Sequence, residues 1–154
     1  MSGYNSSLVD VICEQARRAS KFMVAHSGRQ VLIEVWPFQS GLFDTSPPGA
    51  AWPHNTGHPI MPVIASFLWE NEDEDAFWLS QINESLSTIF KVASSHGLAQ
   101  SEWPRYLNTS LETTPVELIY GGKENVERLG RVRAVWDKDD VMSLTGGFKI
   151  PLMK

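Results

Sequence analysis

The sequence predicts an α+β fold, in which a small antiparallel sheet carries helices on one of its faces. Two segments repeat apolar residues at helical spacing, and two short apolar runs that suit strands stand between them. The order helix, strand, loop, strand, helix and returning segment fits helices layered on such a sheet. Because 154 residues are enough to bury a core, we expect residues 1–154 to form a single domain.

The first predicted elements are a helix and a strand. Residues 6–26 place apolar side chains at spacings of three and four, with charged side chains on the other face, which predicts an amphipathic helix. Ser6 or Ser7 can cap its start, and Gly28 stands where a helix end favours a left-handed residue. Residues 30–36 are β-branched and apolar, and they predict the first strand.

A long irregular stretch separates the two predicted strands. Residues 37–59 hold several prolines and glycines, so we expect a loop, and a loop this long in a compact domain is more often functional than idle. Residues 60–69 predict the second strand, although Pro62 limits pairing near its start.

The second half of the chain predicts a long helix and then shorter elements. The acidic run over residues 70–75 complements the dipole of a helix that ends before Gly97. Residues 115–120 are a candidate for a third strand. Residues 125–135 predict a short helix.

Composition excludes several classes of function. The net charge of −5, without a basic run, argues against a nucleic-acid partner. No apolar stretch is long enough to cross a bilayer, and the first residues do not resemble a secretory signal, so we expect a cytoplasmic protein without a membrane partner. The single cysteine cannot form an internal disulfide, and the four histidines lack metal-ligand spacing, so no metal site is expected.

A series of short motifs follows in order along the chain. Its members are Ala50-Ala51-Trp52-Pro53-His54-Asn55, Leu68-Trp69, Tyr106-Leu107-Asn108, Tyr120-Gly121-Gly122, Arg128-Leu129, Val132 and Trp136-Asp137. Over residues 29–151 this series resembles the berberine-bridge-enzyme-like FAD-linked oxidases, in the second half of their substrate-binding domain and their C-terminal segment. The resemblance implies a truncated member, without the flavin domain.

The chain departs from this family at the positions that would carry its redox chemistry. Thr109 stands where the family often has a catalytic tyrosine, Asn55 follows the histidine in place of arginine, and Pro62 falls where a carboxylate base is often found. No glycine-rich phosphate cradle precedes a helix. We therefore expect no bound cofactor, and no oxidation by flavin.

Glu34 is the first candidate catalytic residue, since it interrupts an apolar strand. On an alternating strand it shares a face with Leu32 and Trp36. One interpretation is a solvent-facing residue of a one-sided sheet. The other is a general acid or base in a pocket that Trp36 helps to line.

The proline-rich loop supplies two further catalytic candidates, His54 and His58, which lie near Trp52. Histidine is well matched to proton transfer near neutral pH, although a loop histidine is also often structural or solvated. Trp36 and Trp52 are candidate substrate contacts, because aromatic rings commonly line apolar pockets; core packing is the alternative role for both.

Four more residues are candidates for substrate binding. Ser66, on the second strand, can donate a hydrogen bond to a carbonyl. Tyr106, Asn108 and Thr109 lie in the segment that the resemblance assigns to the active site. Tyr106 and Asn108 can orient an oxygen-bearing ligand, while a purely packing role for Tyr106 stays open.

Two classes of function fit these residues. The first is a cofactor-independent enzyme of natural-product biosynthesis. It would shape an apolar, oxygenated small molecule for cyclisation, of the Diels–Alder or hetero-Diels–Alder type, or for dehydration or isomerisation. The second is a non-catalytic pseudoenzyme, either a ligand-binding protein or an accessory subunit of a full-length flavin oxidase. In both cases we expect a C2 homodimer, which would either complete the sheet at its open edge or cover the sheet face left open without a flavin domain, with a cavity enclosed at the interface.

Overall fold

The computed structural model of the protein describes residues 1–43, 49–53, 60–145 and 150–152. In this part of the chain, four α-helices accompany one two-stranded antiparallel sheet, so the predicted α+β class is confirmed. The chain divides into two compact units. Unit 1 comprises Met1–Ser40 and His58–Gln100, and unit 2 comprises Gly41–Gly57 and Ser101–Lys154. That residues 1–154 behave as a single domain stays a prediction.

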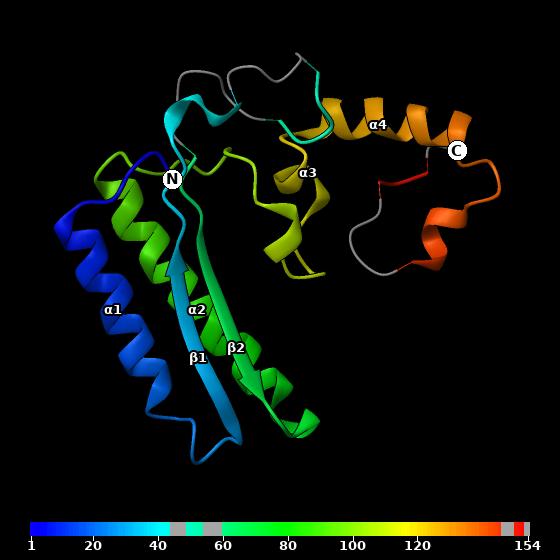
Figure 1. Cartoon of the computed structure of the whole chain (residues 1–154). Helices are drawn as coiled ribbons and strands as arrows, with labels where there is room; N and C mark the ends of the chain where they lie inside the picture. Colours follow the sequence, from blue (N-terminus) through cyan, green and yellow to red (C-terminus); the bar gives the residue numbers. More distant parts are fainter. Residues whose placement is uncertain (44–48, 54–59, 146–149, 153–154) are drawn as a thin grey trace. The chain divides into compact units, whose positions relative to one another are not determined.

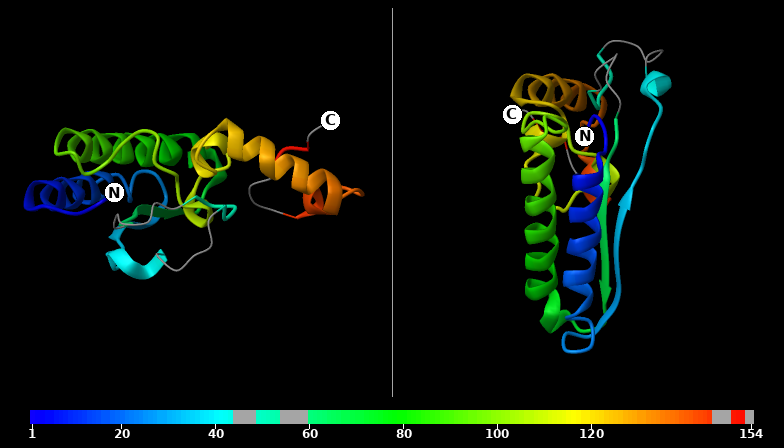
Figure 2. Two further views of the ribbon diagram at one scale, coloured as in Figure 1. Left: turned by 90° about the horizontal axis from the view of Figure 1, so that it is seen from above. Right: turned by 90° about the vertical axis from the view of Figure 1, so that its left-hand side faces the viewer.

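Unit 1 contains the sheet and the two longer helices. Its elements are α1 (Ser6–Ser20), β1 (Gly28–Val35), β2 (Val63–Trp69) and α2 (Asp75–Ser95), with the short 3-10 helix Glu72–Glu74 before α2. Figure 1 shows both helices running alongside the strand pair, and the right-hand view of Figure 2 shows them on the same side of it. The predicted layer of helices on one sheet face is therefore confirmed.

The sheet is a single antiparallel pair. Its register runs from Val35 opposite Val63 to Gly28 opposite Trp69, and it is irregular between Gly28 and Gln30. The strand pattern of the sequence located both strands, although β2 begins three residues later than predicted, just after Pro62. Proline cannot donate a ladder hydrogen bond, which explains the later start.

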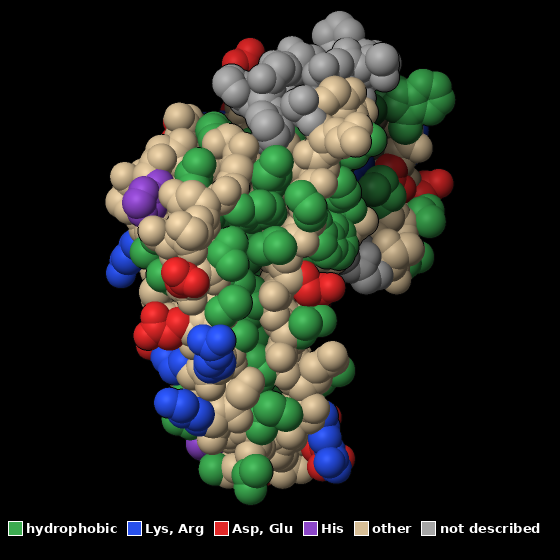
Figure 3. All heavy atoms as spheres, turned by 60° about the vertical axis from the view of Figure 1, so that its left-hand side comes forward, with side chains coloured by type: hydrophobic (Ala, Val, Ile, Leu, Met, Phe, Trp, Pro, Cys, Tyr) green, Lys and Arg blue, Asp and Glu red, His purple; other side chains and the backbone are tan. Residues whose placement is uncertain are grey.

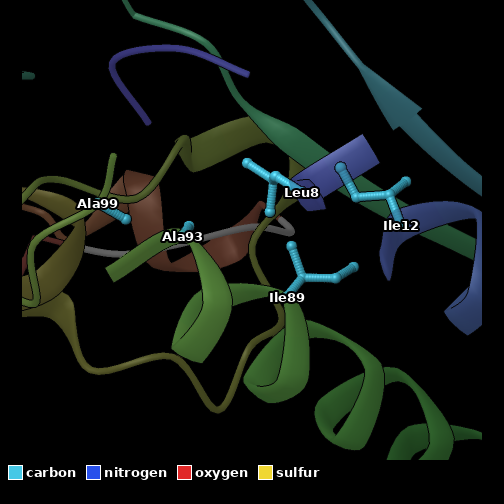
Figure 4. Packing of buried hydrophobic residues seen from close by; sticks show 5 residues of the cluster. All are labelled: Leu8, Ile12, Ile89, Ala93 and Ala99. Carbon is cyan, nitrogen blue, oxygen red and sulfur yellow. The ribbon is translucent and has the colours of Figure 1, made fainter. Parts of the chain in front are cut away.

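The core of unit 1 lies between the helices and the sheet. Leu8 and Ile12 of α1 pack with Ile89 and Ala93 of α2 and with Ala99 beyond it. Figure 4 shows the side chains of Leu8, Ile12 and Ile89 directed toward one another. Burial of these side chains holds the two helices together, since each removes apolar area from water.

The sheet contributes one of its faces to this packing. Ile33 of β1 and Val63 of β2 pack against the core cluster. The ring of Phe67 meets that of Trp78 on α2 edge to face, with centroids 5.9 Å apart. Ile33, Val63 and Phe67 therefore lie on the sheet face that packs on the helices. The residues that alternate with them along each strand lie on the opposite face.

Hydrophobic side chains also reach the surface of unit 1. Figure 3 shows them gathered in a strip on the side where α1 lies beside the sheet, with charged side chains on either side. The exposed hydrophobic residues of these elements include Val9, Leu32 and Val35.

Both predictions about the ends of the first helix are wrong. Asn5, not Ser6 or Ser7, is the N-cap: its side-chain oxygen accepts a hydrogen bond from the Leu8 amide at 2.8 Å. An asparagine cap competes well with serine, because its carbonyl reaches the same free amides.

The helix ends at Ser20, before the predicted boundary at residue 26, and the left-handed residue that follows is Ser27, with φ 51°. Gly28 instead begins β1. A Cβ atom there would lie 2.6 Å from Cζ2 of Trp78 and 2.9 Å from Cα of Met23, so glycine is required by close approach and not by a helix end.

Unit 2 is built on two helices, α3 (Val116–Ile119) and α4 (Lys123–Trp136), with the 3-10 helices Leu107–Thr109 and Val141–Leu144. A further short 3-10 helix, Ser40–Phe43, follows β1 at the boundary between the two units. Among the described residues, the core of unit 2 contains Ile119, Tyr120, Val126 and Leu129.

The predicted third strand over residues 115–120 is wrong, because this segment forms α3. The Leu118 amide bonds to the Pro115 carbonyl and the Tyr120 amide to the Val116 carbonyl. A short apolar run cannot be assigned to strand or helix by pattern alone, and a proline at its start suits a helix entry. Gly121 and Gly122 follow with φ 72° and 115°, which ends the helix.

A buried arginine ties the end of α4 to the residues after it. The side chain of Arg133 is only 3% exposed. It donates to Asp137 at 3.1 Å and to Ser143 at 2.7 Å, and it also bonds to Asp140 and to the Ile150 carbonyl. This network links Asp137, Asp140, Ser143 and the Ile150 carbonyl to the end of α4.

Candidate functional site

The predicted site residues of unit 1 gather on the sheet face that the helices leave open. Leu32 lies opposite Ser66, and Glu34 lies opposite Ile64. Directly opposed residues of an antiparallel pair point to the same side, so Glu34 and Ser66 share a face although they come from different strands. We call Leu32, Glu34, Ile64 and Ser66 the sheet-face group.

The sheet-face group changes from exposed to buried along the strands. Leu68, beyond Ser66 on the same face, is 56% exposed, whereas Ile64 is only 5% exposed. Glu34 and Ser66 are half-buried. Within the part of the chain that the structure describes, the carboxylate of Glu34 makes no hydrogen bond or ion pair. Such a carboxylate can exchange a proton with a molecule that reaches this face.

Trp36 lies just beyond β1. Its backbone amide donates to the Pro62 carbonyl at 3.1 Å, and its ring meets Phe38 edge to face with centroids 6.2 Å apart. The hydroxyl of Tyr4 donates to the same carbonyl at 2.8 Å. Pro62 is the position where the family resemblance implies a carboxylate base, and here its backbone oxygen receives both donors.

Tyr4 is a residue that sequence reasoning missed. Burial raises the pKa of its phenol to about 12, partly offset by a hydrogen bond with the Trp36 backbone. The phenol therefore stays protonated, and a donor, up to a higher pH than an exposed tyrosine does. No motif or period marks this tyrosine in the sequence, because its partner is 58 positions away.

The predicted site residues of unit 2 come together around Tyr106. The indole N–H of Trp52 donates to the Arg105 carbonyl at 2.9 Å, and the Trp52 and Tyr106 rings meet edge to face with centroids 6.1 Å apart. Asn108 Nδ2 donates to the Tyr106 hydroxyl at 3.3 Å, and the Thr109 hydroxyl bonds to the Tyr106 carbonyl at 3.4 Å. We call Trp52, Tyr106, Asn108 and Thr109 the aromatic group.

Two side chains of α4 hold the loop that carries Trp52. Arg128 donates to the carbonyls of residues 49 and 50 at 3.0 and 3.3 Å. Asn125 donates to the carbonyls of Ala51 and Tyr120 at 3.0 and 2.8 Å, and its own oxygen accepts from Arg128 at 3.0 Å. Arg128 belongs to the motif series, but its bonds to this loop are not visible in the sequence, and no motif marks Asn125.

The same loop packs closely on the turn after α3. A Cβ atom on Gly121 would lie 2.4 Å from Cγ of Pro53, and Gly121 also has φ 72°. Both the contact and the backbone conformation require glycine. The Tyr120-Gly121 motif therefore positions the Trp52 loop.

Two predicted catalytic residues, His54 and His58, lie outside the described residues. Among the residues that are described, no group of three or more His, Cys, Asp or Glu side chains is placed to hold a metal ion. No helix in the same part of the chain combines the length and the apolar character that a membrane crossing requires.

Comparison with known proteins gives one partial similarity. No protein-family model matches the chain, and no solved structure matches it. The chain is 36% identical over 93 residues to the FAD-dependent monooxygenase tpcD of Cochliobolus heterostrophus. The matched part is 57% of this chain and 17% of that protein, so the chain spans about a sixth of the length of its relative. This similarity indicates a distant relation to FAD-linked proteins, while membership of the berberine-bridge-like family and truncation stay predictions.

Proposed function

We propose that the chain is a cofactor-independent enzyme of natural-product biosynthesis. It binds a bulky, apolar, oxygenated small molecule and holds it for cyclisation, of the Diels–Alder or hetero-Diels–Alder type, or for dehydration or isomerisation. The observation that carries the proposal is the aromatic group: Trp52 and Tyr106 are far apart in sequence, yet they form one edge-to-face pair with Asn108 on the phenol.

The chemistry of the aromatic group suits such a ligand. Aromatic rings offer a large apolar surface at a small cost in side-chain entropy, and the Tyr106 hydroxyl and Asn108 amide add polar atoms at its edge. The loop is held at residues 49–51 by Arg128 and Asn125, which keeps Trp52 in place. A rigid binding surface favours catalysis by positioning, because less ordering is left to the moment of reaction.

A cycloaddition places few demands on the protein. Two σ-bonds form as two π-bonds are lost, so no electron or proton enters or leaves. Hydrogen bonds from a phenol or an amide to a substrate carbonyl stabilise the charge that develops there. In the isomerisation variant, Glu34 accepts a proton from one carbon and returns it to another. In the dehydration variant, Glu34 accepts the proton from carbon as hydroxide leaves the neighbouring carbon, and the proton then passes to the hydroxide to give water. The sheet-face group supplies the site for these transfers.

The relation to an FAD-dependent monooxygenase supports a small, oxygenated substrate in the same broad chemistry. In this proposal the chain acts on such a molecule without electron transfer. Where the family resemblance implies a catalytic tyrosine and a carboxylate base, this sequence carries Thr109 and Pro62.

The test is to incubate the purified chain with polyene or quinone-methide intermediates that carry a carbonyl, and to follow the products by chiral chromatography with mass detection. We expect faster and more stereoselective product formation than in buffer. Tyr106→Phe and Asn108→Ala should lower the rate if the aromatic group orients the substrate. A product rate and ratio that match buffer across the tested intermediates would contradict the proposal.

Glu34→Gln separates the two kinds of reaction. It should abolish dehydration or isomerisation, whereas a cycloaddition should proceed at nearly the wild-type rate. Glu117→Gln is the matched control, since Glu117 is an exposed carboxylate on α3. Circular dichroism of each variant confirms that the fold is intact.

A second candidate is a non-catalytic protein that binds a ligand or serves a full-length flavin oxidase. It is favoured by hydrogen bonds that already engage two polar groups of the aromatic group: the Trp52 indole donates to the Arg105 carbonyl, and the Tyr106 hydroxyl accepts from Asn108. Calorimetry with the same intermediates distinguishes the two: saturable binding without turnover favours this second candidate.

A further inference from the structure

Ser20, the last residue of α1, follows a pair of arginines. Arg17 and Arg18 stand three and two positions before it, and residues 15–27 carry no acidic side chain. Ser20 is the one serine or threonine of the sequence with arginine at both of these positions. Many protein kinases select hydroxyl residues by this charge pattern, because carboxylates in their substrate grooves pair with the guanidinium groups. The pattern therefore marks Ser20 as a candidate for phosphorylation.

The structure leaves this segment open to solvent. Arg17, Ser20 and the following Lys21 are all exposed. Residues three positions apart on a helix are neighbours, so Arg17 and Ser20 lie on the same face of α1. Figure 1 shows that α1 ends here, at the turn that leads into β1. The hydroxyl and one of the two arginines are thus accessible in the folded chain.

The last turn of α1 is held by weak hydrogen bonds. The Lys21 amide donates to the Arg18 carbonyl and the Met23 amide to the Ser20 carbonyl, both at 3.3 Å, which is longer than usual for a backbone bond. The Ser20 hydroxyl donates to the Ala16 carbonyl at 2.8 Å, a contact that slightly destabilises a helix. This turn therefore opens more readily than the turns before it.

Arg18 restrains the opening of this turn. Its guanidinium donates to three side chains of α2: Gln81 at 2.8 Å, Glu84 at 3.0 Å and Ser85 at 3.1 Å. A kinase must align the hydroxyl with the phosphoryl group that it transfers, and a serine within a helix cannot be aligned until its turn unwinds. Arg18 must then leave α2 to enter the groove of the kinase.

We propose that Ser20 is a phosphorylation site for an arginine-directed serine/threonine kinase, and that the bonds from Arg18 to α2 limit the rate. Ser20 Oγ forms a bond to the γ-phosphorus of ATP as the bond from that phosphorus to the β-phosphate oxygen breaks. ADP leaves, and the hydroxyl proton passes to the catalytic aspartate of the kinase. This site does not rest on the proposed catalytic function.

The test is to incubate the full chain with ATP and the catalytic subunit of cyclic-AMP-dependent protein kinase, which is arginine-directed, and to locate phosphate by peptide mass spectrometry. We expect phosphate at Ser20 and none at this position in Ser20→Ala. Arg17→Ala should slow the reaction at least about tenfold, because a charge-assisted pair with the kinase is lost. Arg131→Ala is the matched control: it removes an exposed arginine of α4 and should leave the rate unchanged.

Glu84→Ala tests the restraint, because it removes one acceptor of the Arg18 guanidinium and should raise the rate. Glu117→Ala, which removes an exposed carboxylate of α3, should leave it unchanged. Circular dichroism at the assay temperature shows whether each variant is folded. Absence of phosphate at Ser20, or an equal rate in Arg17→Ala, overturns the site, and an unchanged rate in Glu84→Ala overturns the restraint. The product assay is read separately, so failure of either proposal is recognised on its own.

Discussion

The approach of β1 to α2 depends on the missing side chain of Gly28. A Cβ atom there would meet Cζ2 of Trp78 at 2.6 Å and Cα of Met23 at 2.9 Å. The Trp78 ring lies in the buried core and Met23 Cα is backbone, so neither yields cheaply.

We therefore expect Gly28→Ala to lower the free energy of unfolding by about 1–3 kcal/mol, as overpacking does in other cores. Urea unfolding measures the change. Gly3→Ala is the matched control, because its Cβ would only touch Leu98 at 3.6 Å, and it should stay within about 0.5 kcal/mol of the wild type. Equal effects of the two substitutions would contradict the close-approach argument.

The buried phenol of Tyr4 should make the free energy of unfolding fall as the pH rises above 10. Its hydroxyl bonds to the Pro62 carbonyl, and burial raises its pKa from 10.0 to about 12. Because the unfolded chain loses this proton first, the stabilising effect is complete below pH 10 and is lost as the pH rises toward about 12.

The expected result is a free energy of unfolding that falls more steeply between these pH values in the wild type than in Tyr4→Phe. Urea unfolding at a series of pH values measures the slope, and ultraviolet titration of the phenolate identifies the group. Burial also raises the pKa of Tyr120, but Tyr120 is present in both proteins and cancels in the comparison. Parallel slopes would show that Tyr4 is not the group responsible.

At the scale of elements, side chains of α4 hold the loop that carries Trp52 through hydrogen bonds to its backbone. Arg128 reaches two carbonyls of residues 49–50 with one guanidinium nitrogen, while its Nε bonds to Asn125. Lysine cannot reproduce this arrangement, since its ammonium is a single point of donation.

Arg128→Ala should therefore increase hydrogen exchange in peptides that cover residues 49–53, with Arg128→Lys intermediate. Peptides from unit 1 should exchange as in the wild type. Arg131→Ala is the control on the same helix, because Arg131 is exposed and makes no hydrogen bond among the described residues. Unchanged exchange at residues 49–53 in Arg128→Ala would show that the loop is held without the clamp.

The elements that the sequence predicts well are those with a long, regular pattern. The apolar spacing located α1 and α2, and the apolar runs located β1 and β2. The prediction of a strand over residues 115–120 was wrong because a run of six residues with mixed apolar and polar side chains fits a strand or one helical turn equally well. The cap at Asn5 was missed because serine follows it immediately, and both residues can cap.

The candidate site shows a different limit of sequence reasoning. The resemblance assigned Tyr106, Asn108 and Thr109 to one segment, and alternation placed Glu34 on a strand face. That Trp52 meets Tyr106, and that Asn125 holds the Trp52 loop, depends on contacts between segments more than fifty positions apart. No local period or motif encodes such contacts, so only the structure reveals them.

At the scale of the whole molecule, the two units differ in how much they bury. The core of unit 1 spans both of its helices and its sheet, with Trp78, Leu8 and Ile89 almost fully buried. Among the described residues, unit 2 has a core of four buried hydrophobic residues, and the polar networks of Arg128 and Arg133 add to it. A small core supplies only a few kcal/mol, and polar networks open more readily to water than packed apolar side chains do.

We therefore expect unit 2 to open before unit 1. Native-state hydrogen exchange at increasing, sub-denaturing urea should give a lower opening free energy for amides of α4 than for amides of α2. The α2 amides should approach the free energy of global unfolding, since they pack on the larger core. If α4 and α2 instead shared one opening free energy and one urea dependence, residues 1–154 would unfold as the single cooperative domain that the sequence predicts.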